Sequence, residues 1–411
     1  MARGAERKAR DMRVSRTRLW GAALGAGVLA LSACAPGSGD DAAANDEGAK
    51  TVEVGLITSQ TGPLAAYGKA FLDGFDAGLD YATDGTGEVD GTKIEIRKGD
   101  DAGDPDKGVQ LAKQYIGDGV NILTGSVSSG VALPLAEQAA QNKVLFVSGA
   151  AAADAITGVN DYTFRSGRQS IQDVATAGTF LDDLAGKKVL VFAQDNAFGQ
   201  GNAAAVDALL GENGQGAKVS SLLVAEDIKE FTSFAQQIID KKPDLVFVAW
   251  AGETTGAMWQ ALEQQGVFDT APIVTGLGDI ASYGAYGPVA EKISFLSHYF
   301  ADAPDNEVND AMVAAVEKAG SQADLFTPDG FVAAQMVVHA IGEGQGDVDA
   351  MVSALEGWTF DAPKGEQTIR ESDHAMLQPM YQAKLVADGD GFKPELVETV
   401  PADQVAPPEA G

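Results

Sequence analysis

The chain has 411 residues, of which 45% are hydrophobic and 21% charged, a composition typical of a globular protein with two or three domains. A single cysteine excludes an internal disulfide, and three widely separated histidines give no metal-ligand spacing, so no metal or other cofactor is expected. Lys and Arg total 29 against 59 Asp and Glu, and the resulting net charge of −30 disfavours nucleic acid and other polyanions as partners.

The first residues are typical of an exported protein. Seven basic side chains precede an uncharged run from Leu19 to Leu31, which is too short to span a membrane comfortably. The sequence Leu31-Ser32-Ala33-Cys34 then resembles the bacterial lipobox. We therefore expect residues 1–33 to be a lipoprotein signal peptide and Cys34 to carry the lipid. A buried free thiol is the alternative for Cys34, and Met12 is an alternative start.

Two segments have compositions that predict flexibility. Residues 34–50 and 399–411 have few large apolar side chains, so we expect a flexible tether and a flexible tail. No later run reaches the ~20 apolar residues of a membrane helix. The body is therefore expected outside the cytoplasm, lipid-anchored to the outer face of the cell membrane, although the sequence leaves open which membrane carries the anchor.

From residue 51 the pattern alternates between strands and helices. Short apolar runs separated by helices of 10–15 residues predict parallel sheets that are covered on both faces. Asp104-Pro105 is a helix start, in which Asp caps and Pro takes the first helical position. The alternation of strands and helices occurs twice, at 51–165 and 187–290, which indicates two similar α/β lobes. In chain order, the expected elements are strand 52–58, helix 64–81, strands 93–97 and 121–123, helix 131–141, and strands 144–147, 188–192, 220–224, 245–249 and 273–275.

Small polar loops follow several of the strands in the first half. They comprise residues 59–63, 125–130 and 148–152. In such sheets ligands bind outside the carboxyl ends of the strands, and N–H groups at a helix start favour an anion such as a carboxylate. Each loop alone also fits a tight turn, but three at one rim indicate a binding site.

Several motifs resemble the leucine/isoleucine/valine-type extracellular binding proteins of ABC transporters, in order over about residues 51–395. They are Thr61-Gly-Pro-Leu-Ala-Ala-Tyr-Gly68, Gly99-Asp-Asp-Ala-Gly-Asp-Pro105, Ser128-Ser129, Tyr162-Thr-Phe-Arg165, Asp195-Asn-Ala-Phe-Gly-Gln-Gly201, Pro243-Asp-Leu-Val-Phe247 and Asp373-His-Ala-Met-Leu-Gln-Pro-Met380.

The resemblance implies an α/β, two-lobe clamshell of the type I periplasmic-binding-protein kind, which closes on a small molecule and docks on membrane permease subunits. Lobe 1 is expected to comprise 51–165 plus 300–358, and lobe 2 to comprise 166–297 plus 362–398. The chain then crosses between lobes near 165–168, 297–300 and 358–364. Such a protein binds without making or breaking bonds, and we expect a monomeric, non-enzymatic component of an importer.

The same resemblance suggests where the ligand lies. It implies aromatic packing from Tyr67, a carboxylate-binding hydroxyl at Ser129 beside Ser128, and a backbone contact at Ala151. Phe198 stands where the family usually has tyrosine. Trp250 follows a strand and could face the cleft, as could Tyr299, although Tyr299 and His298 also fit a role in packing the hinge.

Two departures from the family bear on the ligand. Ala152 stands where amino-acid binders usually have a hydroxyl, and Leu277 falls opposite the acidic residue that holds the ligand's ammonium group. Asp279, two positions on, could substitute. A desolvated ammonium group needs such a partner. Branched-chain amino acids are therefore the default ligand, and a non-amino-acid carboxylate, such as an aromatic acid, is the alternative.

The sequence bears on three other functional classes. Gly199-Gln-Gly201-Asn-Ala-Ala204 fits a dinucleotide fingerprint, but three residues separate it from the preceding strand. No Gly-x-Ser-x-Gly motif or neighbouring histidine supports a serine hydrolase at Ser128 or Ser129. A clamshell sensor lipoprotein would share every ligand residue and stays open.

Overall fold

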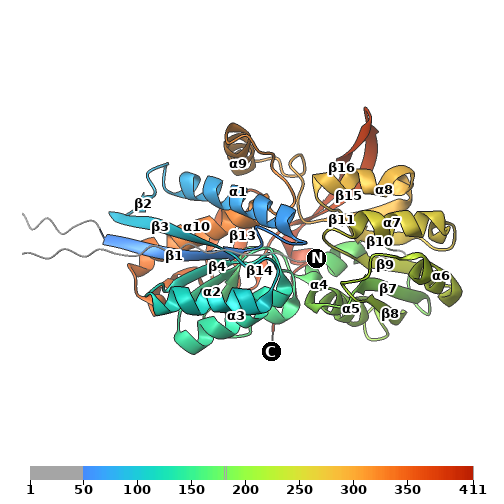
Figure 1. Cartoon of the computed structure of the whole chain (residues 1–411), viewed down its shortest axis with the longest axis horizontal. Coiled ribbons are helices and arrows are strands. Elements are labelled where there is room, and N and C mark those ends of the chain that lie inside the picture. The colour runs from blue at the N-terminus through green and yellow to red at the C-terminus, as the bar shows by residue number, and fades with distance from the viewer. Residues whose placement is uncertain (1–49, 180, 182, 411) are drawn as a thin grey trace, which may run out of the picture. The chain divides into compact units, whose positions relative to one another are not determined.

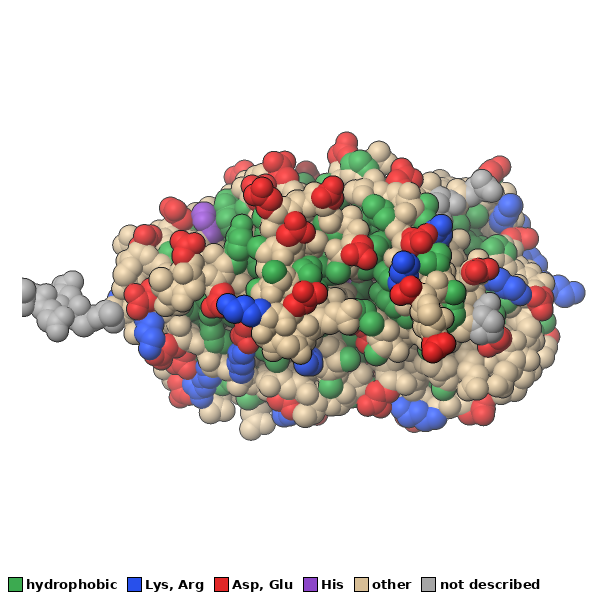
Figure 2. Space-filling view, turned by 90° about the horizontal axis from the view of Figure 1, so that it is seen from above, with side chains coloured by type: hydrophobic (Ala, Val, Ile, Leu, Met, Phe, Trp, Pro, Cys, Tyr) green, Lys and Arg blue, Asp and Glu red, His purple; other side chains and the backbone are tan. Residues whose placement is uncertain are grey.

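The computed structural model describes residues 50–410 apart from 180 and 182. The expected signal peptide (1–33), Cys34 and the tether up to residue 49 lie outside the described residues, whereas Lys50 already belongs to the first strand. Within the described residues, no helix combines the length and apolar character needed to cross a membrane. Figure 2 shows carboxylate side chains spread over the face seen from above, as the negative net charge implies.

The first sheet has six strands in the order β2-β3-β1-β4-β5-β6, and only the short β2 is antiparallel to its neighbour. Figure 1 labels β1 to β4 of this sheet. Its central strands carry continuous buried runs at residues 54–58, 122–125 and 145–148, as expected for strands covered on both faces. Its strands are β1 (Lys50–Thr58), β2 (Glu88–Val89), β3 (Thr92–Asp100), β4 (Ile122–Gly125), β5 (Leu145–Ser148) and β6 (Thr163–Arg165).

Successive side chains of these strands enter two different cores. Leu145 and Val147 pack with helices on one face, whereas Phe146 packs with helices on the other, because neighbouring residues of a strand point to opposite faces. The first face is covered by α1 (Ala65–Ala82), α10 (Thr327–Gly344) and α11 (Val348–Leu355), and the second by α2 (Pro105–Gly117) and α3 (Ser129–Asn142). The expected start of α2 is confirmed, since Asp104 accepts hydrogen bonds from the N–H groups of Asp106 and Lys107.

The second sheet repeats this arrangement. The order β8-β7-β9-β10-β11 corresponds to β3-β1-β4-β5-β6, with two antiparallel strands, β15 and β16, added at the β11 edge. The twofold rhythm in the sequence is thus confirmed as two sheets of the same order. The strands are β7 (Lys188–Gln194), β8 (Lys218–Val224), β9 (Leu245–Ala249), β10 (Ile273–Gly276), β11 (Ile293–Ser297), β15 (Met380–Asp388) and β16 (Gly391–Val400).

Helices cover both faces of this sheet as well. One face is covered by α6 (Thr232–Lys241), α7 (Thr255–Gln264) and α8 (Tyr283–Tyr286), and the other by α4 (Ser170–Gly178) and α5 (Ala197–Leu210). We call this sheet with α4–α8 the second lobe. The first lobe is the first sheet with α1–α3, α10 and α11, together with α9 (Glu307–Lys318), which packs on α1 through Met312.

The third passage between the lobes lies later than the sequence predicts. A small sheet of β12 (Thr359–Ala362), β13 (Gly365–Ile369) and β14 (Met376–Leu377) follows α11. Its buried residues Phe360, Ile369 and Met376 belong to the core of the first lobe, whereas Tyr381 belongs to that of the second. The chain therefore crosses near residues 378–380 instead of 358–364, because these short strands find their apolar partners in the first lobe.

The last residues are ordered against the body, contrary to the expected flexible tail at 399–411. Val405 is fully buried, and the guanidinium of Arg370 donates to the carbonyls of Pro407 and Pro408. The N–H of Ala410 donates to Asp373. Residues 401–410, which we call the strap, therefore run from β16 of the second lobe to the first lobe. Composition suggested disorder, but hydrogen bonds to backbone groups hold this segment in place.

A glycine allows α1 and α10 to pack closely. A Cβ on Gly330 would lie 1.9 Å from the carbonyl oxygen of Phe71 and 2.8 Å from the nitrogen of Phe75. Gly330→Ala is therefore expected to lower the free energy of unfolding by ~1–3 kcal/mol, since both helix backbones must separate. Thermal and urea unfolding measure the loss. Gly117→Ala, which meets no atom within 4 Å, is the control, and equal stability of both variants would contradict this packing.

Candidate functional site

A cavity of about 420 Å³ lies between the two lobes at the carboxyl ends of their strands. In each sheet two neighbouring strands send their following helices to opposite faces, β1 and β4 in the first lobe and β7 and β9 in the second. Ligands of α/β sheets bind at such points. The loops after all four of these strands line the cavity, and its volume suits a small molecule.

The first-lobe wall presents the start of α3. Ser128, Ser129 and Gly130 line the cavity. The Oγ of Ser129 accepts the N–H of Ala153 at 3.1 Å, so its own proton remains free to donate. The backbone N–H groups of Ser129 and Gly130 have no acceptor among the described residues, as is usual for the first turn of a helix. Together with the dipole of a 14-residue helix, these donors favour an anion.

Aromatic side chains form much of the remaining surface. Tyr67 of α1 packs edge-on against Phe326 with ring centroids 4.8 Å apart. Burial raises the pKa of the Tyr67 hydroxyl well above its ordinary value, with a smaller contribution from Asp279, so Tyr67 stays neutral. In the second lobe Trp250 stacks on Phe192 at 5.2 Å and donates its Nε1–H to Thr254 at 2.9 Å. These contacts fix Trp250 as a rigid, mainly apolar wall.

The second-lobe wall carries no carboxylate at the position next to β10. Leu277 lines the cavity and is only 3% exposed. Asp279 does not line it, because its carboxylate accepts the N–H of Ser282 at 3.1 Å and caps a short 3-10 turn. Asp279, which could substitute for an acidic residue at Leu277, is therefore directed away from the cavity by this turn in the present structure.

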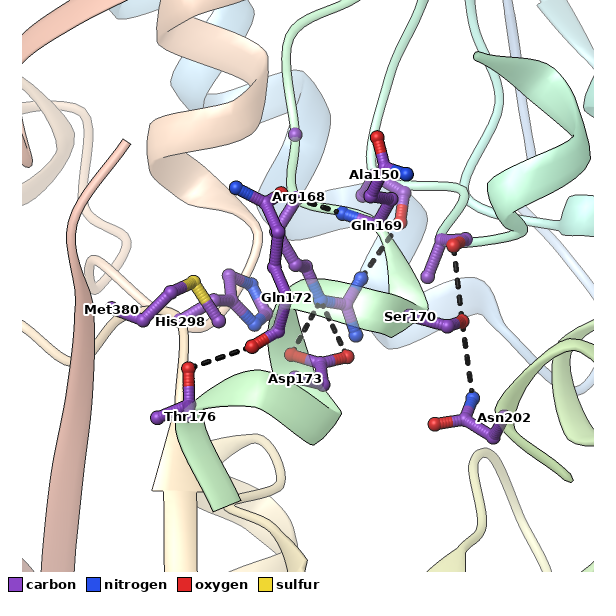
Figure 3. A network of polar contacts seen from close by, with 12 residues as sticks. Ala150, Arg168, Gln169, Ser170, Gln172, Asp173, Thr176, Asn202, His298 and Met380 are labelled. Atoms are coloured by element: carbon purple, nitrogen blue, oxygen red, sulfur yellow. Dashed lines mark hydrogen bonds and ion pairs between the residues drawn. The ribbon is translucent and has the colours of Figure 1, made fainter. Parts of the chain in front are cut away.

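The base of the cavity holds an arginine and a histidine that the sequence analysis did not assign to the site (Figure 3). Arg168 pairs through Nε with the carboxylate of Asp173 at 3.2–3.3 Å and donates through Nη1 to the carbonyl of Ala150 at 3.2 Å. His298 is 3% exposed, and burial lowers its pKa, as do the positive charges of Arg168 and Lys364. His298 is therefore neutral near pH 7.

Two contacts join the lobes beside the cavity. The N–H of Ile280 in the second lobe donates to both carboxylate oxygens of Asp324 in the first lobe, at 3.1 and 3.2 Å. Burial raises the pKa of Asp324 to about 6, and the negative charge of Asp279 adds to the effect. Gly252 has a φ of +80°, and a Cβ there would lie 3.0 Å from the carbonyl oxygen of Pro63. The structure is thus a closed form of the cleft.

Six of the nine residues expected at the site line this cavity: Tyr67, Ser128, Ser129, Ala152, Phe198 and Trp250. The other three do not. Ala151 packs in the core beneath the loop, with its carbonyl accepting from Arg165 at 2.7 Å. Tyr299 points away, packs in the core with α9 and donates its hydroxyl to Asn309 at 3.0 Å. Asp279 caps the turn described above.

Arg168 and His298 lie just beyond strand ends. Arg168 comes three residues after β6 and His298 one residue after β11, at two of the passages between the lobes. Such positions face the cleft in a clamshell, so a basic or polar residue there was a usable signal. In the sequence alone, the same positions equally fit hinge packing.

Comparison with known proteins agrees with this geometry. A family model described as periplasmic binding protein matches residues 51–390. An ABC-type branched-chain amino acid transporter protein from Rhodopseudomonas palustris CGA009 shares 32% identity, with a TM-score of 0.71, covering 87% of this chain and 99% of that one. A solute-binding protein from R. palustris BisB5, solved with 3,4-dihydroxybenzoic acid, shares 25% identity with a TM-score of 0.74, covering 86% and 98%.

A curated relative gives a similar match. A Leu/Ile/Val-binding protein of Rhizobium johnstonii is 28% identical over 328 residues, which cover 78% of this chain and 88% of that protein. The family model spans most of the chain, including the first sheet from residue 51, the second sheet apart from β16, and every loop around the cavity. The chain belongs to the periplasmic binding protein family of ABC-transporter solute-binding proteins.

Proposed function

We propose that this chain is the extracytoplasmic ligand-binding component of an ABC importer, held to the outer face of the cell membrane by a lipid on Cys34. A small solute enters between the lobes, stabilises the closed form by its contacts to both lobes, and is passed to permease subunits in the membrane. The interlobe cavity, the family match and the lipobox-like segment before Cys34 support this role. Binding and closure require no chemical step.

The ligand that the site fits best is a small carboxylate with an apolar or aromatic body. The observation that carries this choice is the contrast between the two walls. Free N–H groups and a hydroxyl gather at the start of α3, whereas Leu277 and Trp250 present an apolar wall opposite. An amino acid would place its ammonium group in this cavity, where the buried Asp173 is already paired with Arg168 and the other lining carboxylates, Asp104, Glu226 and Glu253, are exposed.

Both ligand classes occur among similar proteins. The R. johnstonii protein is named for leucine, isoleucine and valine, whereas the R. palustris BisB5 protein was solved with an aromatic acid. The polar start of α3 suits the carboxylate of either class. The apolar wall at Leu277 favours aromatic or other acids that carry no ammonium group.

A thermal-shift screen tests the proposal. Residues 35–411 are refolded to remove carried ligand and screened against leucine, isoleucine, valine, polar amino acids, aromatic acids and short amides. A ligand at 100 times its Kd adds about 2.7 kcal/mol to the folded state, enough to raise Tm by at least about one degree. We expect shifts with aromatic or branched aliphatic acids. Increases in Tm that occur only with amino acids would contradict the proposed class of acids without an ammonium group. No increase in Tm with any carboxylate would contradict a carboxylate-binding site.

The ligand affinity should depend on pH through Asp324. In an open cleft this carboxylate is hydrated and its pKa returns to about 3.9, whereas closure raises it to about 6. A proton therefore binds more tightly to the closed form. Affinity for the best acid of the screen should increase about tenfold as the pH falls from 7.5 to 5.

Asp324→Asn should remove this dependence, because an amide keeps an acceptor for Ile280 but does not titrate. The exposed Asp349→Asn variant should keep it. Calorimetric titration at both pH values measures the effect. An unchanged slope in Asp324→Asn, or a wild-type affinity that weakens with falling pH, would contradict this role.

A further inference from the structure

Arg168 offers one unused donor to the cavity. Its side chain is 91% buried, and Nε and Nη1 are occupied by Asp173 and by the carbonyl of Ala150 (Figure 3). Its Nη2 has no acceptor among the described residues and is not enclosed by protein atoms. Since Arg168 lines the cavity, this nitrogen is available to a bound molecule. The face of Phe326, 5.6 Å away, limits the movement of the guanidinium.

The charges around Arg168 decide what kind of acceptor fits. His298, the titratable group that faces the cavity beside it, is neutral. The described titratable groups that interact here are three basic and three acidic side chains, and burial lowers the pKa of Lys364 to about 7, so the cations do not outnumber the carboxylates. They are Arg165, Arg168, Lys364, Asp154, Asp173 and Asp329. A further buried anion at Nη2 would leave an unbalanced charge, which is costly in a low-dielectric site. A neutral oxygen adds no charge and satisfies the donor.

The start of α3, unlike the surroundings of Arg168, offers donors that are not paired with carboxylates among the described residues. Its free donors are backbone N–H groups and the Ser129 hydroxyl, which carry no counterion and suit a full negative charge. The loop of residues 150–153 joins the two places, since Ala150 contacts Arg168 and Ala153 contacts Ser129. Three residues of chain span at most about 11 Å, so both places belong to one stretch of the cavity wall.

We propose that Arg168 is a specificity-determining residue, and that the ligand carries a second, uncharged oxygen, a hydroxyl or carbonyl group, which accepts a hydrogen bond from Nη2. This inference rests on the proposed function and narrows its ligand class from small carboxylates to hydroxy- and oxo-acids. The carboxylate lies at the start of α3, and the second oxygen lies at the base of the cavity. The desolvated guanidinium then discriminates against acids that lack this oxygen, because an unpaired buried donor is costly.

Matched pairs of acids test the proposal by calorimetric titration of residues 35–411. The aromatic set is benzoate with 3- and 4-hydroxybenzoate, and the aliphatic set is pentanoate with its 4-oxo and 4-hydroxy forms, whose second oxygen stands away from the carboxylate. Wild type should bind at least one oxygen-bearing acid at least tenfold more tightly than its parent. The double variant Arg168→Met with Asp173→Asn leaves no unpaired carboxylate in the cavity. It should lose the preference for the oxygen-bearing acid, while its affinity for the parent acid changes less than about threefold.

Lys229→Met is the matched control, because Lys229 also lines the cavity but is exposed at its rim. This variant should keep the wild-type preference. Equal weakening of parent and oxygen-bearing acids in the double variant would show that Arg168 acts on the carboxylate or on the hinge, and would overturn the proposal. Wild-type binding without any preference would overturn it too, even if the double variant does not fold. Failure of wild type to bind any acid would instead reject the proposed ligand class.

Discussion

Leu277→Glu should reverse the ligand preference of the cleft. The new carboxylate would stand in an apolar wall facing the bound acid, where both desolvation and like-charge repulsion oppose binding. Affinity for the best acid of the thermal-shift screen should fall at least about 100-fold, which corresponds to about 2.7 kcal/mol. The same carboxylate should pair with an ammonium group, so the variant should gain a thermal shift with leucine, isoleucine or valine that wild type lacks.

Leu277→Gln separates charge from shape in this test. Glutamine has the size of glutamate without its charge, so it should weaken acid binding far less than Leu277→Glu and should gain no response to amino acids. Calorimetric titration at pH 8 keeps the introduced carboxylate ionised. Wild-type binding of leucine, or unchanged acid affinity in Leu277→Glu, would show that this wall does not face the ligand's charged group.

Arg165→Met should destabilise the protein more than any other single change considered. Arg165 is 1% exposed and donates five hydrogen bonds, to the carbonyls of Ala151, Ala153, Gly167 and Arg168 and to the hydroxyl of Thr157, at 2.7–3.3 Å. Burial lowers its pKa only to about 10, so it is charged at neutral pH. Methionine would leave these acceptors unsatisfied and remove a cation near Asp154.

The expected cost exceeds about 4 kcal/mol, enough to lower Tm by at least about 5 °C. Differential scanning calorimetry with circular dichroism measures it. Arg97→Met, at a partly exposed ion pair with Asp118, is the control and should change Tm little. Because Arg165 holds the loop of residues 150–153 against the first passage between the lobes, acid affinity should fall as well. A stable Arg165→Met variant would mean that water replaces this network.

Much of the fold could be predicted because it depends on local patterns. Leu245–Ala249 is a strand in the structure with the expected bounds, and Asp104-Pro105 begins α2 as its capping chemistry requires. The loops that follow β1 and β4 were expected at a ligand site because strand ends gather at one edge of a parallel sheet. The structure places these loops along the cavity.

The remaining differences depend on partners that are distant in sequence. The third passage between the lobes shifted because Ile369 and Met376 pack against strands more than 200 residues earlier. Asp279 is diverted by a turn three residues long, which no apolar pattern signals. Arg168 becomes a cavity residue only because Asp173 and Ala150 hold it at the base. Such positions need the tertiary contacts, since local sequence permits several placements.

The strap has a consequence for fluorescent sensors built from this protein. Its last described residues are hydrogen-bonded to Arg370 and Asp373, so a fluorophore at Glu409 would move with the first lobe although β16 belongs to the second. An energy-transfer pair between that position and α1 would stay at constant separation while the cleft opens and closes. A donor in the β15–β16 turn at Gly389, paired with an acceptor on α1, would instead change separation on each cycle and report solute capture.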